Sequence, residues 1–541
     1  MIHFCLWDEP WIPVILPSGE TATVSIREAL LKAHELREVY DPSPLVTVAI
    51  HRLLLAVLYR VYHPHGFKEW AGLWRAGSFD PAPLDAYGAK WAERFDLLHP
   101  THPFYQVPRI EDEEVHPITW LIMEAASGNN PTLFDHGQAE GGEGLTPGRA
   151  ACHLLAQQLF AVGGGVSKPF NRMDGPLTKG LVVEAKSNRS LFETLSLNLM
   201  PLDRWTGLVP ETVIDRPFWE EETPPEPDRS GTVPRGPLHY LTWQSRQIHL
   251  CVDDRAGIIT GCQFRQRYCL PKDGRKTDPW KPHRKDKKEG WQPFKLDREK
   301  AAWQFTHVLL QEAPGGEIEP PGLVEWLAEV TTRGNEAGLS VPPVIALAVS
   351  GLATDPQKAA KIELWRREVL PLPAEFLKDN ELVGDLRDLI LEARKAEALL
   401  QLTGTVLAWG LGERHDLPEV LTYFRTRKPP GGKVPDQFIA FGRGFGMVAR
   451  FWPALEAPFR RALAELPEED FATVRERWRA AVRLAAGQAF QGVRDGLIHA
   501  QAPYEVLTQI DHCFHTRLAN LFATKAEENE GGDVDDPESD E

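Results

Sequence analysis

A glycine-rich segment of this sequence has the residue types needed to approach a phosphate closely. Gly163-Gly-Gly-Val-Ser-Lys-Pro169 holds three consecutive glycines and then Lys168. Glycine lets the backbone approach a ligand where a side chain would clash, and its N–H groups can face an anion. The spacing does not match the G-x-x-x-x-G-K-[ST] loop of nucleotide-binding enzymes, and a plain turn fits the same residues. The nearby Lys168 and Arg172 favour an anion or nucleic-acid contact at Gly163, Gly164 and Gly165.

A second segment, residues 265–300, concentrates positive charge within an acidic chain. It holds thirteen Lys and Arg residues against six Asp and Glu. Aromatic residues are interleaved with them, namely Tyr268, Trp280, Trp291 and Phe294. Cations placed at phosphates release counterions, so binding through them would depend on salt. Asp273-Gly274 and Glu289-Gly290 predict turns of one or two β-hairpins. A solvated charged surface explains the same composition, but the local bias favours nucleic acid.

Two loops are less specific. Ser127–His136 is rich in Gly, Asn and Pro and contains the apolar Phe134. Phe134 either folds back onto the core or stacks on a base when the loop orders on a partner. In residues 350–358, Thr354 or Asp355 is predicted to cap a following helix that contains Ile362, Trp365 and Arg366. Helix capping explains most of that segment.

Catalytic and metal-binding motifs are missing from the sequence. It has no H-E-x-x-H, no G-x-S-x-G and no EF-hand loop, so we assign no catalytic residue, no metal and no cofactor. The six cysteines form no C-x-x-C pair and suit a reducing cytoplasm. No signal peptide is visible, and the apolar stretches near residues 46–59 and 342–352 are expected to be too short to span a bilayer.

The net charge of −17 does not exclude a nucleic-acid partner. The residues after Lys525 carry nine acidic groups, no basic group and no aromatic residue, so we expect a disordered tail over residues 526–541. This tail accounts for about half of the net charge. What matters for binding DNA is where positive charge is concentrated.

The elements around these segments predict an α+β fold. Residues 1–373 mix short apolar runs with many Pro, Gly and Trp, which indicates a large irregular domain with long functional loops. Residues 374–525 hold four long amphipathic segments separated by Pro- or Gly-containing connectors, which is typical of a four-helix bundle. The segment over residues 437–465 contains Pro453 and Pro458, so we expect a kink or break there.

These segments, in this order, resemble the CasA (Cse) family, the large subunit of the type I-E CRISPR Cascade complex. The resemblance covers nearly the whole chain and rests on the joint order of several short motifs. They are Asp8-Glu-Pro-Trp-Ile-Pro-Val14, His102-Pro-Phe-Tyr-Gln106, Ser127-Gly-Asn-Asn130, Gly163-Gly164-Gly165, Ser350-Gly-x-x-x-Asp355 with Trp365-Arg366-Arg367 and Leu370-Pro-Leu-Pro373, and Arg450-Phe-Trp-x-x-Leu-Glu456. The chain departs from some relatives in lacking their C-x-x-C pairs and the Asn-rich run of their wedge region.

The resemblance implies a non-catalytic protein for antiviral defence that recognises the protospacer-adjacent motif of double-stranded DNA. It also implies that the protein helps to open the duplex for guide RNA pairing and recruits a helicase-nuclease. Its partners would be the other Cascade subunits, the guide RNA and the target DNA, without a membrane. Carried over from the family, Gly163, Gly164 and Gly165 would approach the DNA closely, and Lys285, Lys287 or Lys288 would be the minor-groove lysine, with the register left open. Thr354, Asp355 and Gln357 would form the wedge. Lys168 is added as a DNA contact from its place beside the glycines. Asn130 and Phe134 would contact the guide RNA 5′ handle or a neighbouring subunit.

Two other functions stay open at this level. A scaffold that binds only protein would use the basic stretch to face an acidic partner. A metal-independent hydrolase would use His102 or His136.

Overall fold

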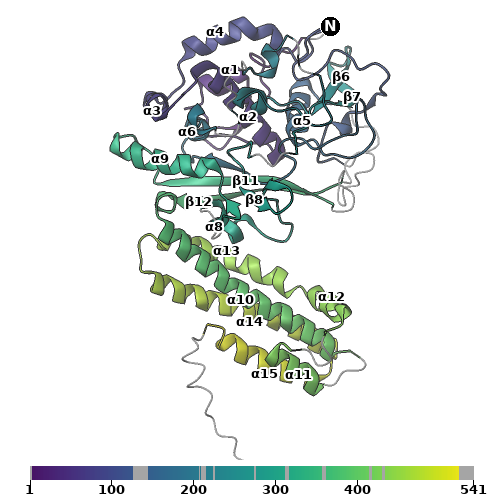
Figure 1. The fold of residues 1–541 in the computed structure, drawn as a ribbon, viewed down its shortest axis with the longest axis vertical. Coiled ribbons are helices and arrows are strands. Elements are labelled where there is room, and N and C mark those ends of the chain that lie inside the picture. Colours follow the sequence, from purple (N-terminus) through teal and green to yellow (C-terminus); the bar gives the residue numbers. More distant parts are fainter. Residues whose placement is uncertain are drawn as a thin grey trace, which may run out of the picture. The chain divides into compact units, whose positions relative to one another are not determined.

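The computed structural model describes residues 3–125, 144–205, 208, 215–222, 224, 226–272, 276–310, 316–355, 361–412, 417–428 and 433–522. The chain forms two compact units, which Figure 1 draws in sequence colours. The first unit comprises Met1–Ala302 and Val308–Lys378, and the second comprises Trp303–His307 and Asp379–Glu541. A mixed helix-and-strand unit followed by a helical one confirms the predicted α+β class.

The core of the first unit is built on α2 (Pro44–Tyr62), in which every residue from Pro44 to Tyr59 is buried. The Ser43 hydroxyl accepts the N–H of Val46, and Pro44 occupies the first turn, so the helix has a well-defined start. The helix is long and apolar enough to cross a membrane, which corrects the expectation from the sequence. However, 83% of its most apolar window is buried inside the protein, as in a core helix.

The strands of the first unit form four three-stranded sheets, and the described strand pairs are antiparallel. Their orders are β2-β1-β3, β10-β8-β9, β12-β11-β5 and β4-β7-β6. The strands are β1 (Ile12–Ile15), β2 (Thr21–Val24), β3 (Glu38–Val39), β4 (His116–Pro117), β5 (Val182–Lys186), β6 (Arg246–Asp253), β7 (Ile258–Gln266), β8 (His283–Asp286), β9 (Gly290–Pro293), β10 (Ile318–Glu319), β11 (Val344–Thr354) and β12 (Ile362–Pro373). The helices besides α2 are α1 (Ile26–Leu31), α3 (Phe67–Ala76), α4 (Pro81–Trp91), α5 (Pro147–Phe160), α6 (Leu191–Asn198), α7 (Pro237–Leu241), α8 (Thr306–Leu310) and α9 (Gly322–Glu336).

The helix predicted after Thr354 and Asp355 does not form. The residues after Lys361 form the strand β12 and not a helix capped by Thr354 or Asp355. β12 pairs along its length with β11, from Thr354 opposite Ile362 to Val344 opposite Pro373. The almost wholly buried β11 offers a continuous partner, and this long-range pairing overrides the local capping signal. Pro371 and Pro373 are tolerated because β12 is an edge strand.

The second unit is helical. The four segments predicted for it correspond to α10 (Asn380–Gly410), α12 with α13 (Asp436–Gly444, Met447–Glu465), α14 (Phe471–His499) and α15 (Tyr504–Ala519). The short α11 (Leu417–Thr426) is not among the predicted helices. Trp303 also packs in this unit, with its ring 5.5 Å from that of Trp452 and 4.7 Å from that of Phe459.

The break in the second segment does not fall at its prolines. Pro453 and Pro458 lie inside α13, which continues through both. The helix is held by its buried face, to which Phe451, Trp452 and Phe459 belong. The chain breaks instead before α13, at Gly446, whose φ of 69° is the left-handed conformation that favours glycine.

Buried histidines of the first unit predict a loss of stability in mild acid. Burial lowers the pKa of His153 and His283 to about 4 and that of His239 to about 3, with nearby Arg149, Lys281 and Arg235 adding to the effect. The unfolded chain takes up these protons near pH 6.5 and the folded chain does not, so stability falls as the pH drops from 6.5 towards 4. At pH 5 each such histidine should cost about 2 kcal/mol relative to pH 7.5. Urea unfolding at both pH values measures the loss. A His283→Gln variant should lose about 2 kcal/mol less than the original protein, and an equal loss would contradict the assignment.

Candidate nucleic-acid interface

The glycine loop (Gly163–Lys168) is closed by a pair of backbone hydrogen bonds. The N–H of Gly164 donates to the carbonyl of Arg172 at 2.9 Å, and the N–H of Arg172 donates to the carbonyl of Gly165 at 3.2 Å. Gly164 and Gly165 have φ values of 108° and 83°, which residues with a side chain rarely adopt. The glycines therefore allow a tight reversal of the chain.

Buried polar groups fix the base of this loop. The N–H of Gly163 donates to Asp174 Oδ1 at 2.7 Å, and a Cβ at this position would lie only 2.9 Å from that oxygen. The guanidinium of Arg246 donates to Gln266 Oε1 at 2.7 Å and to the carbonyl of Val162 at 3.0 Å. Burial lowers the pKa of Arg246 to about 9. A fully buried cation held by carbonyl oxygens gives the loop a rigid base.

The apex of the glycine loop is open to solvent. Gly164, Gly165 and Lys168 are exposed, and the Val166 side chain is 87% exposed. Among the described residues, Lys168 forms no ion pair. A rigid base below an exposed backbone apex is suited to close approach by a ligand.

The second element is the basic hairpin (His283–Pro293), in which β8 pairs with β9. Lys285 lies opposite Trp291, with its ammonium 5.8 Å from the ring centroid. The Asp286 carboxylate closes the turn by accepting the N–H groups of Lys288 at 2.7 Å and Glu289 at 2.9 Å. This confirms the turn predicted at Glu289-Gly290.

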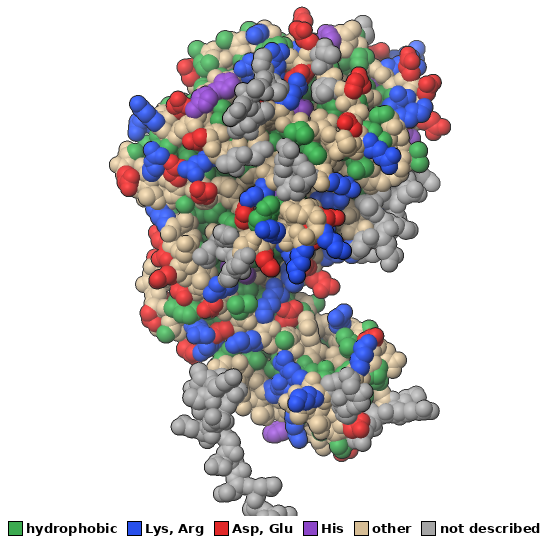
Figure 2. Space-filling model, viewed as in Figure 1, with side chains coloured by type: hydrophobic (Ala, Val, Ile, Leu, Met, Phe, Trp, Pro, Cys, Tyr) green, Lys and Arg blue, Asp and Glu red, His purple; other side chains and the backbone are tan. Residues whose placement is uncertain are grey.

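Three lysines of the basic hairpin remain available for a partner. Lys285, Lys287 and Lys288 are exposed, and none of them forms an ion pair with a described residue. Figure 2 shows Lys and Arg side chains gathered over the region where Figure 1 labels β8, with acidic side chains among them.

Most of the other described basic residues in 265–300 form ion pairs or are buried. Residues 265–300 therefore do not form one continuous positive surface. Arg265, Lys276 and Arg298 pair with Glu113, Glu319 and Glu363, respectively. Arg267, Lys281, Tyr268 and Trp280 are buried. Tyr268 and Trp280 therefore belong to the core and are not available to stack on bases.

The third element is the end of the β11–β12 hairpin. Thr354 is the last residue of β11, and its carbonyl accepts from Arg298 at 3.1 Å. The N–H of Asp355 donates to the carbonyl of Lys361 at 2.9 Å, and the Asp355 carboxylate lies 3.7 Å from the Lys361 ammonium. Both residues lie at the tip of a long hairpin. Gln357 lies outside the described residues, as do Asn130 and Phe134.

The structure also adds residues that the sequence did not single out. Asp174, Arg246 and Gln266 support the glycine loop through contacts that join residues 11 to 84 positions apart. No local pattern marks such residues, because each is an ordinary polar residue until the fold brings it under the loop.

His102 lines a separate cleft of about 690 Å³ with Ala89–Arg94 and Glu222. Burial lowers the pKa of His102, and its ring lies 5.7 Å from that of His99. The lining contains no Ser, Thr or Cys among the described residues, and hence no hydroxyl or thiol nucleophile. Elsewhere in the described ranges, no group of three or more His, Cys, Asp or Glu side chains could hold a metal ion.

Comparisons with known proteins identify the family. The sequence profile of the CRISPR-associated protein Cse1 family matches residues 6–489. The chain belongs to the Cse1 family. A Thermus thermophilus protein described as CRISPR-associated protein CasA/Cse1 is 31% identical over 539 residues, which is 96% of this chain and 98% of the relative.

Solved structures agree with the Cse1 fold. A crystal structure of CasA from Thermus thermophilus has a TM-score of 0.75 at 27% identity, over 96% of this chain and 100% of that one. A chain of a structure described as a CRISPR RNA-guided surveillance complex has a TM-score of 0.69 at 19% identity, over 96% of this chain and 100% of that one. At that identity the second likeness shows the fold alone.

The conformation of the glycine loop gives a paired prediction for this Cse1-family chain. A Cβ at Gly165 would meet nothing within 4 Å, so Gly165→Ala should act only through backbone strain and cost about 1–2 kcal/mol of unfolding free energy. Gly19, with φ of 90° and equally open surroundings, provides the matched control. Urea unfolding should give similar losses for Gly165→Ala and Gly19→Ala. No loss at Gly165 alone would show that the loop does not hold this conformation.

Proposed function

We propose that this chain is the large, non-catalytic subunit of a type I-E CRISPR Cascade complex in the cytoplasm. In this role it recognises the protospacer-adjacent motif in double-stranded DNA, helps to open the duplex for the guide RNA and recruits the helicase-nuclease. Membership of the Cse1 family supports the assignment to a CRISPR system. A chain of an RNA-guided surveillance complex has the same fold, which supports assembly with other subunits and guide RNA.

The observation that carries the DNA-binding part is the basic hairpin. Its three exposed lysines lack acidic partners among the described residues, in a chain with a net charge of −17. Unpaired cations of this kind attract phosphates and release counterions. The exposed backbone of Gly164 and Gly165 adds a contact that is free of side chains.

These elements suit recognition from the minor groove. That groove presents a degenerate pattern of acceptors, so a few lysine and backbone contacts can read a short motif while tolerating some variation. Thr354 and Asp355, with Gln357 beyond them, would then enter beside the motif and separate the first base pairs. Guide RNA pairing would supply the remaining specificity, so no catalytic residue is needed in this chain.

The hairpin lysines provide the test. In the assembled complex, changing Lys285, Lys287 and Lys288 together to Ala should weaken binding to target duplex about tenfold or more. The slope of log affinity against log salt should fall by about 3, because each lost phosphate contact removes about one released counterion. Affinity should be measured across a salt series, together with the thermal stability of the variant.

A matched control removes the same charge elsewhere in the first unit. Lys32, Lys68 and Lys90 are exposed and lie on or beside α1, α3 and α4. Changing these three to Ala should leave the affinity and its salt slope close to those of the original complex. Unaltered binding by the hairpin variant would remove the hairpin from the proposal.

A further inference from the structure

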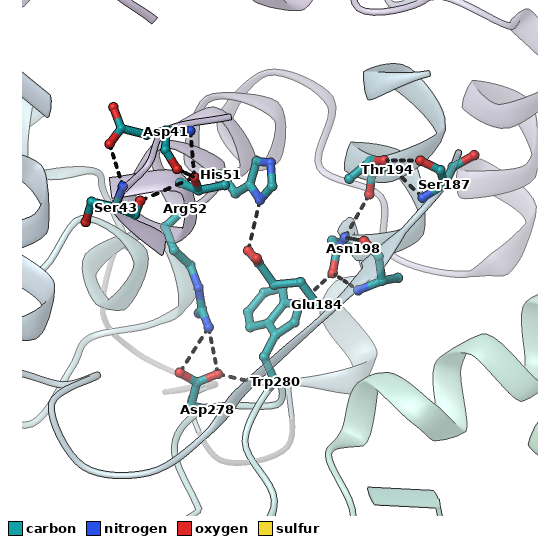
Figure 3. A network of polar contacts seen from close by, with 12 residues as sticks. Asp41, Ser43, His51, Arg52, Glu184, Ser187, Thr194, Asn198, Asp278 and Trp280 are labelled. Carbon is teal, nitrogen blue, oxygen red and sulfur yellow. Dashed lines mark hydrogen bonds and ion pairs between the residues drawn. The ribbon is translucent and has the colours of Figure 1, made fainter. Parts of the chain in front are cut away.

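The charges buried at the foot of the basic hairpin have no role in the function proposed above. Arg52, Asp278 and Lys281 are 1%, 4% and 3% exposed. The Arg52 guanidinium donates to both oxygens of Asp278 at 3.2 Å and lies 4.1 Å from the centre of the Trp280 ring (Figure 3). Such burial is costly unless the groups are paired, so the cluster needs an explanation.

Asp278 is the centre of this cluster. Its carboxylate accepts the backbone N–H of Trp280 at 2.9 Å and the hydroxyl of Tyr240 at 2.9 Å, besides the contact with Arg52. Burial alone would raise the pKa of Asp278, but the charges of Arg52 and Lys281 together with these hydrogen bonds hold it below its usual value. The carboxylate is therefore fixed from three sides, and the core helix α2 supplies one of them.

Lys281 connects the cluster to the glycine loop. Its ammonium donates to the carbonyl of Pro176 and, at 3.1 Å, to that of Lys179. These residues follow Asp174, which holds Gly163, and the Lys179 ammonium pairs with Asp174 at 2.5 Å. Burial lowers the pKa of Lys281 to about 8, against the opposing effect of Asp278.

Lys281 also lies two positions before the start of the basic hairpin. The carbonyl of Pro282 accepts the N–H of Phe294 at 2.8 Å, which closes the foot of the hairpin, and β8 starts at His283. The N–H of Leu181 donates to the carbonyl of Phe294 at 2.8 Å. One short stretch, residues 174–181, therefore contacts both the glycine loop and the foot of the basic hairpin.

We propose that Lys281, whose positive charge Asp278 stabilises, is a positioning residue that fixes the distance between the glycine loop and the basic hairpin. This inference rests on the proposed function, because it concerns how selectively that site reads a motif. Two protein elements that contact one short DNA motif distinguish it well from other sequences only while the distance between the two elements is fixed. Lys281 touches no ligand itself, and its effect passes through the carbonyls of Pro176 and Lys179.

The test separates selectivity from affinity. A Lys281→Met variant keeps the length of the side chain and removes its N–H donors, while the three exposed hairpin lysines remain. The assembled complex is bound to a library of guide-matched duplexes whose flanking positions are randomised. The ratio of its affinity for the best flanking sequence to its affinity for the median one should fall roughly tenfold. The salt slope for duplex binding should stay unchanged. Should Lys281→Met fail to fold, Lys281→Gln replaces the charged ammonium by a shorter, neutral amide and should lower the same ratio to a smaller extent; an unchanged ratio would overturn the inference.

A control variant excludes a general effect of lower stability. Leu30 in α1 is fully buried and makes none of these contacts, so Leu30→Ala lowers stability in the same unit without touching the link. It should retain the motif preference of the original complex. An unchanged preference in Lys281→Met, or a loss no greater than in Leu30→Ala, would overturn the inference.

Hydrogen exchange tests the link without DNA. In the free chain, Lys281→Met should speed the exchange of amides in residues 163–179 and in residues 283–293 together, whereas Leu30→Ala should not. If Lys281→Met leaves the exchange rates of both segments unchanged, the positioning role is overturned, whatever the DNA-binding measurements show. If the original complex shows no motif preference, the proposed function fails, and the exchange result still decides whether Lys281 joins the two segments.

Discussion

One guanidinium nitrogen of Arg52 donates to both carboxylate oxygens of Asp278, which joins the long buried helix α2 to the chain that leads into the basic hairpin. Because both groups are charged and withdrawn from water, neither can leave the contact without a large cost in free energy. The Arg52–Asp278 contact therefore fixes the position of the segment around Asp278 relative to α2. Trp280 extends it, since its indole N–H donates to Asn198 at 3.1 Å and its carbonyl accepts the N–H of Val183 in β5 (Figure 3).

The proposed binding of an anionic partner by an acidic chain depends on the local placement of charge. Six of the twelve described basic residues in 265–300 are paired with carboxylates or buried, and three exposed lysines are gathered at one turn. The glycine loop needs no charge at its apex, because its backbone is the exposed group. Nucleic-acid binding would then depend on a few groups held rigidly and not on the net charge of the chain.

Much of the fold can be predicted from local patterns, and the failures of those patterns have physical causes. The helices of the second unit follow from their apolar periodicity, and the turn at Gly290 follows from its residue types. Local signals predict a helix where β12 forms, because the pairing with β11 that decides its state joins distant residues. A break at Pro453 or Pro458, one of the two outcomes expected there, does not occur for a similar reason, since the buried face of α13 outweighs the hydrogen bonds lost at these prolines. The support of the site by Arg246 and Lys281 depends on the tertiary fold, and no spacing reveals it.

We propose that this chain gives an RNA-guided complex its preference for a short flanking motif. The most direct measurement is the binding of a motif library by the reconstituted complex with and without this subunit, at fixed guide and fixed salt. We expect a narrow set of preferred flanking sequences when the subunit is present and a flat distribution when it is absent. The same distribution in both preparations would contradict it.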